Sequence, residues 1–96
     1  MSPHKRKKLS KIRSELDKLD NTLIKVIKKR TTLVNKVLAL KDKKKQIIDQ
    51  RRIKLILKNI KKKSIQNKID PKITNRIWKN MIWSYIDYEK RNFKKK

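Results

Sequence analysis

Three charged residues stand in rows that are otherwise apolar: Arg30, Arg52 and Glu89. An arginine on an apolar face is costly unless a carboxylate or phosphate pairs with its planar guanidinium, which suits bidentate binding. Arg13 and Lys41 add two cations that the same helical pattern places beside these rows. Pairing with a single acid leaves excess positive charge, which a small dianionic ligand would balance. For each residue alone, the alternative is a structural ion pair or a side chain that extends to the surface.

Glu89 closes an apolar row near the end of a predicted helix. A carboxyl group among apolar and aromatic neighbours can keep its proton and then donate a hydrogen bond. Such a donor stabilises an oxygen atom that gains negative charge during a reaction. The candidate chemistry is therefore the binding and electrostatic stabilisation of an anionic substrate.

A long helix is needed to position most of these cations. Apolar residues recur at alternating steps of three and four, the a and d positions of a heptad, and predict one helix from about residue 9 to 41. Arg30 occupies an a position, and Arg13 and Lys41 occupy e positions beside the row. The row consists of Leu9, Ile12, Leu16, Leu19, Leu23, Val26, Leu33, Val37 and Leu40. The preceding basic arm, 1–8, is either disordered or an extension of this helix.

A second, shorter helix follows a polar connection at 42–46. Its apolar series begins at residues 47–48 and ends near Lys63, with Arg52 on the buried stripe.

A third helix of medium length follows a polar loop at 64–69. Asp70 and Pro71 provide its N-cap and a proline at its first helical position. The next members of its apolar row after Tyr85 are Glu89 and Phe93, and the row begins with Ile73, Ile77 and Met81.

The composition restricts the possible functions. The 96 residues include 32 Lys and Arg against 8 Asp and Glu, a net charge of +24 that attracts nucleic acid, acidic membranes or small anions. With no Cys and one His, the chain has no disulfide, thiolate metal site or histidine cluster. Its apolar runs are far too short for a membrane span or signal peptide, so we expect a cytoplasmic protein.

Four features in this order resemble the all-helical, type II chorismate mutases: L-x-x-L-D at 16–20, K-K-R at 28–30, Lys41, and I-D-P at 69–71. The resemblance covers a domain at about 9–93, between the basic arm and a basic tail at 94–96. It implies an all-α fold of one long, one short and one medium helix in an intertwined homodimer. In such a dimer each of two active sites is completed by the partner chain.

The resemblance also implies roles for the charged residues. Arg30 and the partner subunit's Arg13 would hold the two carboxylates of the substrate, and Lys41 would bind its ether oxygen. Arg52 matches the arginine of the family's second helix, and Glu89 matches a third-helix donor to the ether oxygen. The rearrangement of chorismate to prephenate needs a clamp on the reactive conformer and donors near the breaking C–O bond, without a cofactor or metal.

The second helix departs from the mutase pattern at Ile53. The standard pattern has a glutamate there that binds the substrate hydroxyl, whereas isochorismate-pyruvate lyases on the same fold have an apolar residue. Asp49, Ile53 and Tyr85 join the candidates for substrate binding. An alternative register turns Arg51 rather than Arg52 inward.

We therefore expect a chorismate mutase of aromatic amino-acid biosynthesis, with isochorismate-pyruvate lyase as the alternative. A non-enzymatic basic helical protein that binds nucleic acid is a second alternative, although the usual nucleic-acid motifs do not occur. A structural coiled coil, in which Arg30 sets the register, is a third. Apart from the dianionic substrate and a second copy of the chain, we expect no specific nucleic-acid or membrane partner.

Overall fold

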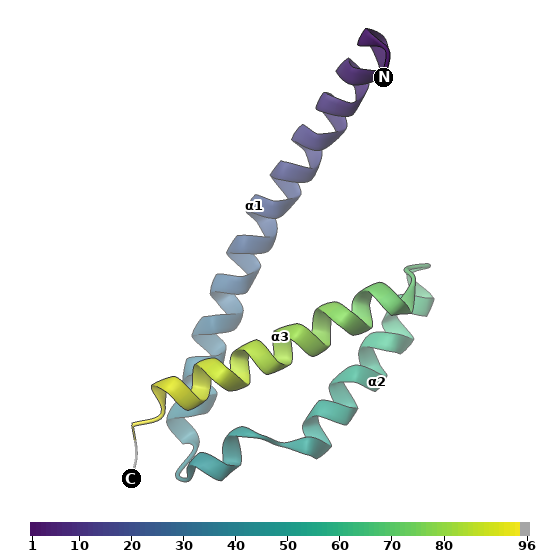
Figure 1. Ribbon diagram of the computed structural model, residues 1–96. Coiled ribbons are helices and arrows are strands. Elements are labelled where there is room, and N and C mark those ends of the chain that lie inside the picture. The colour runs from purple at the N-terminus through teal and green to yellow at the C-terminus, as the bar shows by residue number, and fades with distance from the viewer. Residues whose placement is uncertain (95–96) are drawn as a thin grey trace. The chain divides into compact units, whose positions relative to one another are not determined.

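The computed structural model describes residues 1–94, and these residues form helices joined by short connections (Figure 1). The elements in chain order are α1 at Pro3–Leu40, the 3₁₀ helix η1 at Lys44–Ile47, α2 at Gln50–Gln66 and α3 at Pro71–Asn92. The predicted all-α fold of one long, one short and one medium helix is confirmed for this range. The intertwined homodimer stays a prediction.

The basic N-terminal arm belongs to α1. Pro3 is the first helical residue, and the hydroxyl of Ser2 accepts a hydrogen bond from the backbone N–H of Lys5 at 3.2 Å. A serine cap followed by proline is a favourable start for a helix, because it satisfies a free N–H group and fixes φ. Of the two alternatives for residues 1–8, the structure therefore has the extension of the helix.

The chain divides into two compact units, the first at residues 1–33 and the second beginning at Val34. The predicted domain at 9–93 and its flanking arm stay predictions. The predicted basic tail lies outside the described residues, apart from Lys94.

The first unit is one helix whose apolar row is open to solvent. Between residues 12 and 33, the row members have exposed fractions from 46% for Val26 to 60% for Leu19. Arg30 is exposed as well. The single chain leaves this row uncovered, because the unit contains no second element to pack against it, and its burial in a dimer stays a prediction.

The second unit has a small hydrophobic core. Leu38 at the end of α1, Ile47 in η1 and Ile86 in α3 are buried, with half-buried Ile48, Ile53, Ile82 and Phe93 packed against them. Full burial of one such side chain contributes about 1.5–3 kcal/mol. The core therefore ties the connection between the long helix and α2 to the C-terminal half of α3.

The second helix starts later than its apolar pattern predicts. Ile47 lies in η1, and α2 begins only after Asp49, whose side chain accepts a hydrogen bond from the backbone N–H of Arg52 at 3.0 Å. This N-cap fixes the start of the helix. The helix also ends three residues beyond Lys63. Arg52 is exposed, so its predicted place on a buried stripe is wrong for the single chain, where Ile53 packs against the core instead.

The turn between α2 and α3 begins α3 as predicted. Asp70 accepts a hydrogen bond from a backbone N–H of the first turn at 2.9 Å, and Pro71 is the first helical residue. Just before them, Lys68 adopts a φ of 56°, in the left-handed region that glycine normally occupies. The hydroxyl groups of Ser64 and Thr74 lie 2.6 Å apart and connect the two helices across the turn.

The apolar row of α3 is covered only toward its C-terminal end. Ile86 and Glu89 are buried, whereas Ile73 and Ile77 have exposed fractions of 55% and 51%. The predicted row is therefore a second apolar face that the single chain leaves partly uncovered.

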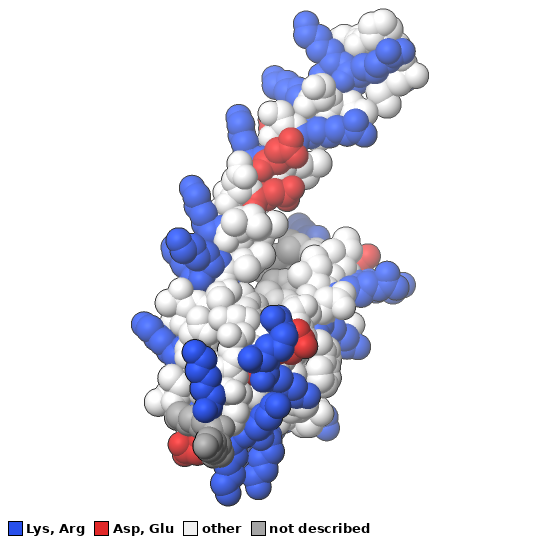
Figure 2. Space-filling view, turned by 60° about the vertical axis from the view of Figure 1, so that its left-hand side comes forward, with Lys and Arg blue, Asp and Glu red and all other residues white. Residues whose placement is uncertain are grey.

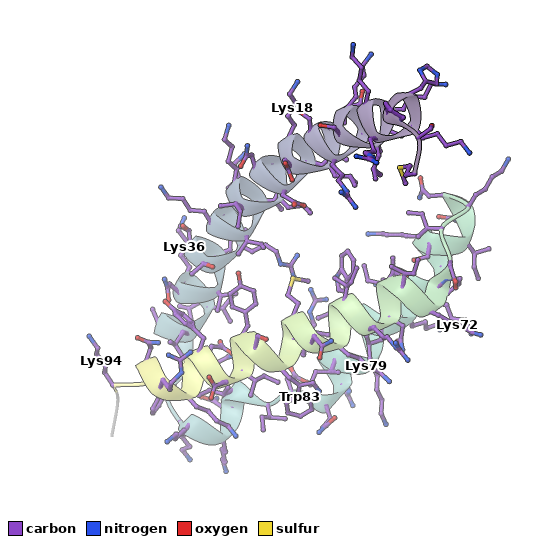
Figure 3. The ribbon with its side chains drawn as sticks, turned by 45° about the horizontal axis from the view of Figure 1, so that its top comes forward. Lys18, Lys36, Lys72, Lys79, Trp83 and Lys94 are labelled. Atoms are coloured by element: carbon purple, nitrogen blue, oxygen red, sulfur yellow. The ribbon has the colours of Figure 1, made fainter. Side chains whose placement is uncertain are left out.

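Among the charged side chains, 32 Lys and Arg outnumber 8 Asp and Glu. Lys and Arg project from much of the face seen in Figure 2, whereas Asp and Glu occupy few places on it. Lys72, Lys79 and Trp83 lie along one side of α3 (Figure 3).

Candidate active site

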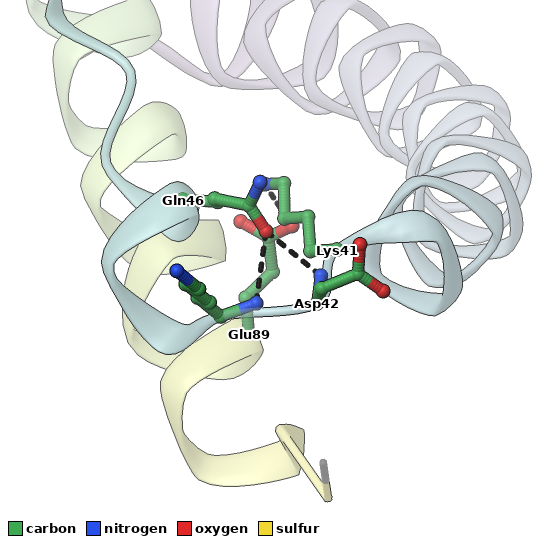
Figure 4. Close-up of polar contacts among 5 residues, drawn as sticks. Lys41, Asp42, Gln46 and Glu89 are labelled. Carbon is green, nitrogen blue, oxygen red and sulfur yellow. Dashed lines mark hydrogen bonds and ion pairs between the residues drawn. The ribbon is translucent and has the colours of Figure 1, made fainter. Parts of the chain in front are cut away.

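An ion pair joins the two residues predicted to be catalytic. The Nζ atom of Lys41 donates a hydrogen bond to Oε1 of Glu89 at 3.0 Å (Figure 4). Lys41 directly follows α1, and Glu89 lies in the last turns of α3, so the pair closes the gap between the ends of these two helices. The exposed fractions of the two side chains are 18% and 8%. Substitution of one partner in such a pair leaves the other charge poorly compensated.

The hydrogen bond makes Glu89 an acceptor toward Lys41, and its predicted role as a donor to the substrate stays a prediction. In this chain, Glu89 accepts a hydrogen bond from an ammonium group rather than donating one. An ammonium group has three donors, and Glu89 uses one of them, so the others can serve an oxygen of a ligand. Lys41 is therefore positioned as a donor, and Glu89 as the group that holds it.

Gln46 holds the backbone directly after Lys41, and it was not among the residues predicted from the sequence. Its Oε1 atom accepts hydrogen bonds from the backbone N–H groups of Asp42 and Lys43 at 2.7 and 2.9 Å (Figure 4). A glutamine three residues after the N-cap residue Lys43 matches the second half of a capping box, which was the available signal. Gln46 therefore ties the backbone directly after Lys41 to the 3₁₀ helix.

A second contact joins the end of α1 to α3. The hydroxyl of Tyr88 donates a hydrogen bond to Oδ1 of Asn35 at 2.9 Å. Tyr85 packs edge-on against Tyr88, with the ring centroids 6.3 Å apart. Tyr85 thus supports the neighbour of Glu89, and its predicted contact with substrate stays a prediction.

The start of α2 holds the remaining candidates of the second unit. The side chain of Asp49 serves as the N-cap, and both Arg51 and Arg52 are exposed. Ile53 is half-buried against the core. Exposed guanidinium groups on the first turn of a helix can reach an anion, so Arg51 and Arg52 are both candidates for binding it.

Arg13 and Arg30 belong to the first unit, and both are exposed. Within residues 1–94, neither forms an ion pair with a carboxylate. The structure therefore brings together Lys41 and Glu89, whereas it leaves the two arginines predicted to hold carboxylates on a separate unit.

The described residues contain neither a candidate metal site nor a membrane-spanning helix. No group of three or more His, Cys, Asp and Glu side chains in the described part of the chain is arranged to hold a metal ion. No helix among residues 1–94 is long and apolar enough to cross a membrane.

The described residues place the chain among all-helical proteins, with a Lys–Glu ion pair between the ends of two helices. Residues 12–90 match the family model described as chorismate mutase type II, and this range contains every candidate residue from Arg13 to Glu89. The chain therefore belongs to the type II chorismate mutase family. Comparisons with curated proteins and with solved structures gave no match.

Proposed function

We propose that the protein is a chorismate mutase that converts chorismate to prephenate. The single observation that carries this proposal is the Lys41–Glu89 pair, at 3.0 Å, within the matched range of the family. The reaction is intramolecular: one C–O ether bond breaks, one C–C bond forms, and no co-reactant is needed. What the protein must supply is a fixed conformer and hydrogen-bond donors where charge grows on the ether oxygen.

In the proposed mechanism, Lys41 donates to the ether oxygen and to a carboxylate of the substrate. Its ammonium group binds the ether oxygen more strongly in the transition state than in the ground state, because negative charge on the oxygen increases as the bond breaks. Glu89 faces the same oxygen, and it helps as a donor only when it carries a proton. Arg52 binds the substrate from the first turn of α2.

The proposed site also needs two arginines that belong to the first unit. In the proposed dimer, Arg30 of one subunit and the partner subunit's Arg13 bind the two carboxylates. The open apolar row of α1 supports this assembly, because its uncovered heptad positions suit the row of a second copy. The exposed Ile73 and Ile77 of α3 provide further apolar surface for the same partner.

The test offers purified protein chorismate and isochorismate separately and measures prephenate, salicylate and pyruvate. Prephenate from chorismate is expected from the parent protein and not from Lys41→Ala. A matched control is Lys45→Ala, which removes an exposed lysine from the adjacent 3₁₀ helix. If neither substrate is converted, the proposed activity is wrong.

Isochorismate-pyruvate lyase is the second candidate, and Ile53 favours it. The side chain is apolar and half-buried against the core, so it offers no acceptor for the ring hydroxyl of chorismate. Faster release of pyruvate from isochorismate than formation of prephenate would replace the first candidate. For the mutase, we propose a cytoplasmic role in aromatic amino-acid biosynthesis.

A further inference from the structure

The segment from α2 through most of α3 is almost free of acidic residues. Between residues 50 and 86 the only acid is Asp70, and its side chain caps α3. The same segment contains eleven basic residues: Arg51, Arg52, Lys54, Lys58, Lys61, Lys62, Lys63, Lys68, Lys72, Arg76 and Lys79. By contrast, residues 9–40 of α1 include three acids among eight basic residues. Positive charge is therefore less compensated over residues 50–86 than over residues 9–40.

Three of these lysines line an open groove between the C-terminal half of α2 and the first turn of α3. The groove has a volume of about 520 Å³ and is lined by Leu57, Lys58, Lys61, Pro71, Lys72 and Asn75. Within residues 1–94, none of the three lysines makes an ion pair. Their ammonium groups are therefore available to an anion in the groove.

A row of cations continues from the groove along α3. Lys72, Arg76, Lys79 and Trp83 follow one another at steps of four, three and four, which places them on one side of the helix. Lys72, Lys79 and Trp83 lie along the same side of α3 in Figure 3. Trp83 has an exposed fraction of 49%. The row thus combines regularly spaced charges with an accessible aromatic ring.

We infer that this basic face, made of the groove and the row that ends at Trp83, binds single-stranded nucleic acid. Neighbouring cations on one helix face are about 5–6 Å apart, so they suit a partner with repeated negative charges rather than one small anion. A positively charged groove that follows the phosphates, together with an aromatic ring on which a base stacks, is the usual way to bind a single strand without sequence preference. A flat membrane surface cannot reach the walls of a groove in the same way. This activity is additional to the proposed catalysis and uses none of its residues.

The first test measures binding of the full chain to a labelled oligo(dT) of about 12 nucleotides, a length within the usual site size, by fluorescence anisotropy at several salt concentrations. The groove variant is Lys58→Gln, Lys61→Gln and Lys72→Gln together. The control variant is Lys11→Gln, Lys18→Gln and Lys25→Gln, which removes the same charge from exposed positions of α1 outside its apolar row. The groove variant should lose about 2 units from the slope of log K against log salt, at about 0.7 for each lost phosphate contact. The control variant should keep the slope of the parent.

The second test uses Trp83→Ala, which should weaken binding by about tenfold through loss of stacking. Equal loss of slope in both triple variants would overturn the inference, because binding would then depend on net charge alone. Equal affinity for a duplex of the same length, or tighter binding to vesicles of phosphatidylcholine and phosphatidylserine, would also overturn it. Turnover of chorismate by the groove variant should match the parent, so failure of the binding inference and failure of the proposed activity remain distinguishable.

Discussion

The first 33 residues and the unit that begins at Val34 differ in how much of their apolar surface they bury. The second unit covers part of its apolar surface with its own elements, and Leu38, Ile47 and Ile86 are buried there. The first unit repeats apolar residues at heptad spacing and leaves them about half exposed. An isolated helix does not need so regular an apolar row. Its exposure to water is unfavourable unless a partner covers it.

The candidate site divides in the same way. Lys41 and Glu89 are brought together by one chain, and Gln46 holds the backbone beside them. Arg13 and Arg30 stand exposed on the unit that lacks a cover. In the proposed site, the hydrogen-bond donor Lys41 is therefore held within a single chain, whereas binding of the substrate carboxylates would depend on assembly.

The strongest test of this comparison is to prevent assembly. Leu23→Glu places a carboxylate in the apolar row, and an unpaired buried charge costs about 3–5 kcal/mol, once for each subunit. We expect a monomer by analytical ultracentrifugation and a loss of turnover of more than about a thousandfold.

Ile24→Glu is the matched control for that variant. Ile24 is also exposed, at 66%, but it lies outside the heptad row. It should keep both the dimer and the activity. If the two variants behave alike, the row is not an interface and the proposed division of the site is wrong.

Arg30→Ala should give the next largest effect. Loss of a charge-assisted contact with a substrate carboxylate costs about 3–5 kcal/mol, or about two to four powers of ten in kcat/KM. Helicity by circular dichroism and the dimer mass should be unchanged, and Lys29→Ala provides a control one residue away. A variant that unfolds would instead identify Arg30 as a structural ion, and near-normal activity would remove it from the site.

Ile53→Glu tests the choice of substrate within the second unit. A hydroxyl group left without a partner costs about 1–3 kcal/mol, so a glutamate that accepts from it should raise mutase kcat/KM by about one or two powers of ten. The melting temperature should fall, because Ile53 packs against the core. Ile53→Gln, of similar size without a charge, separates the two effects. If neither reaction changes, Arg51 rather than Arg52 should be tested as the inward-facing arginine.

Glu89→Gln tests whether the ion pair limits the reaction. A carboxylate beside the reacting oxygen cannot donate to it, whereas a protonated carboxyl group or an amide can. The glutamine variant should therefore have a higher kcat than the parent, by about tenfold, because its amide is a permanent donor. Equal kcat values for the two proteins would show that the reaction does not use a donor at position 89.

The sequence predicted the parts of this molecule that depend on local signals. Spacing and capping predict the heptad row, the start of α3 at Asp70–Pro71, and the order and relative lengths of the three helices. The predicted start of α2 was too early. Two adjacent apolar residues, at 47–48, fit the beginning of an α-helix and fit equally well a 3₁₀ turn that packs into a core.

The partner of Glu89 was not predictable from its own helix. Periodicity places Glu89 on an apolar face, but only the tertiary contact shows that Lys41, 48 residues earlier, meets it there. Arg30 and Arg52 are exposed for a different reason. The apolar spacing around each arginine predicts a buried row, but a single chain shows only the contacts that it makes alone, without those of an assembly.

Gln46→Ala should have the smallest effect and tests whether the backbone beside Lys41 must be rigid. The variant loses two hydrogen bonds to backbone N–H groups, each worth about 0.5–1.5 kcal/mol, in a connection that is partly open to water. We expect kcat to fall by about three- to tenfold with little change in KM, because Lys41 acts mainly on the transition state. Gln46→Glu keeps an acceptor oxygen in place and should restore most of kcat, which a role in stability alone would not require. A fall in melting temperature with unchanged kcat would limit the role of Gln46 to folding. An equal fall in kcat for Lys45→Ala, at an exposed neighbour, would show that the whole connection sets the position of Lys41, rather than the Gln46 cap.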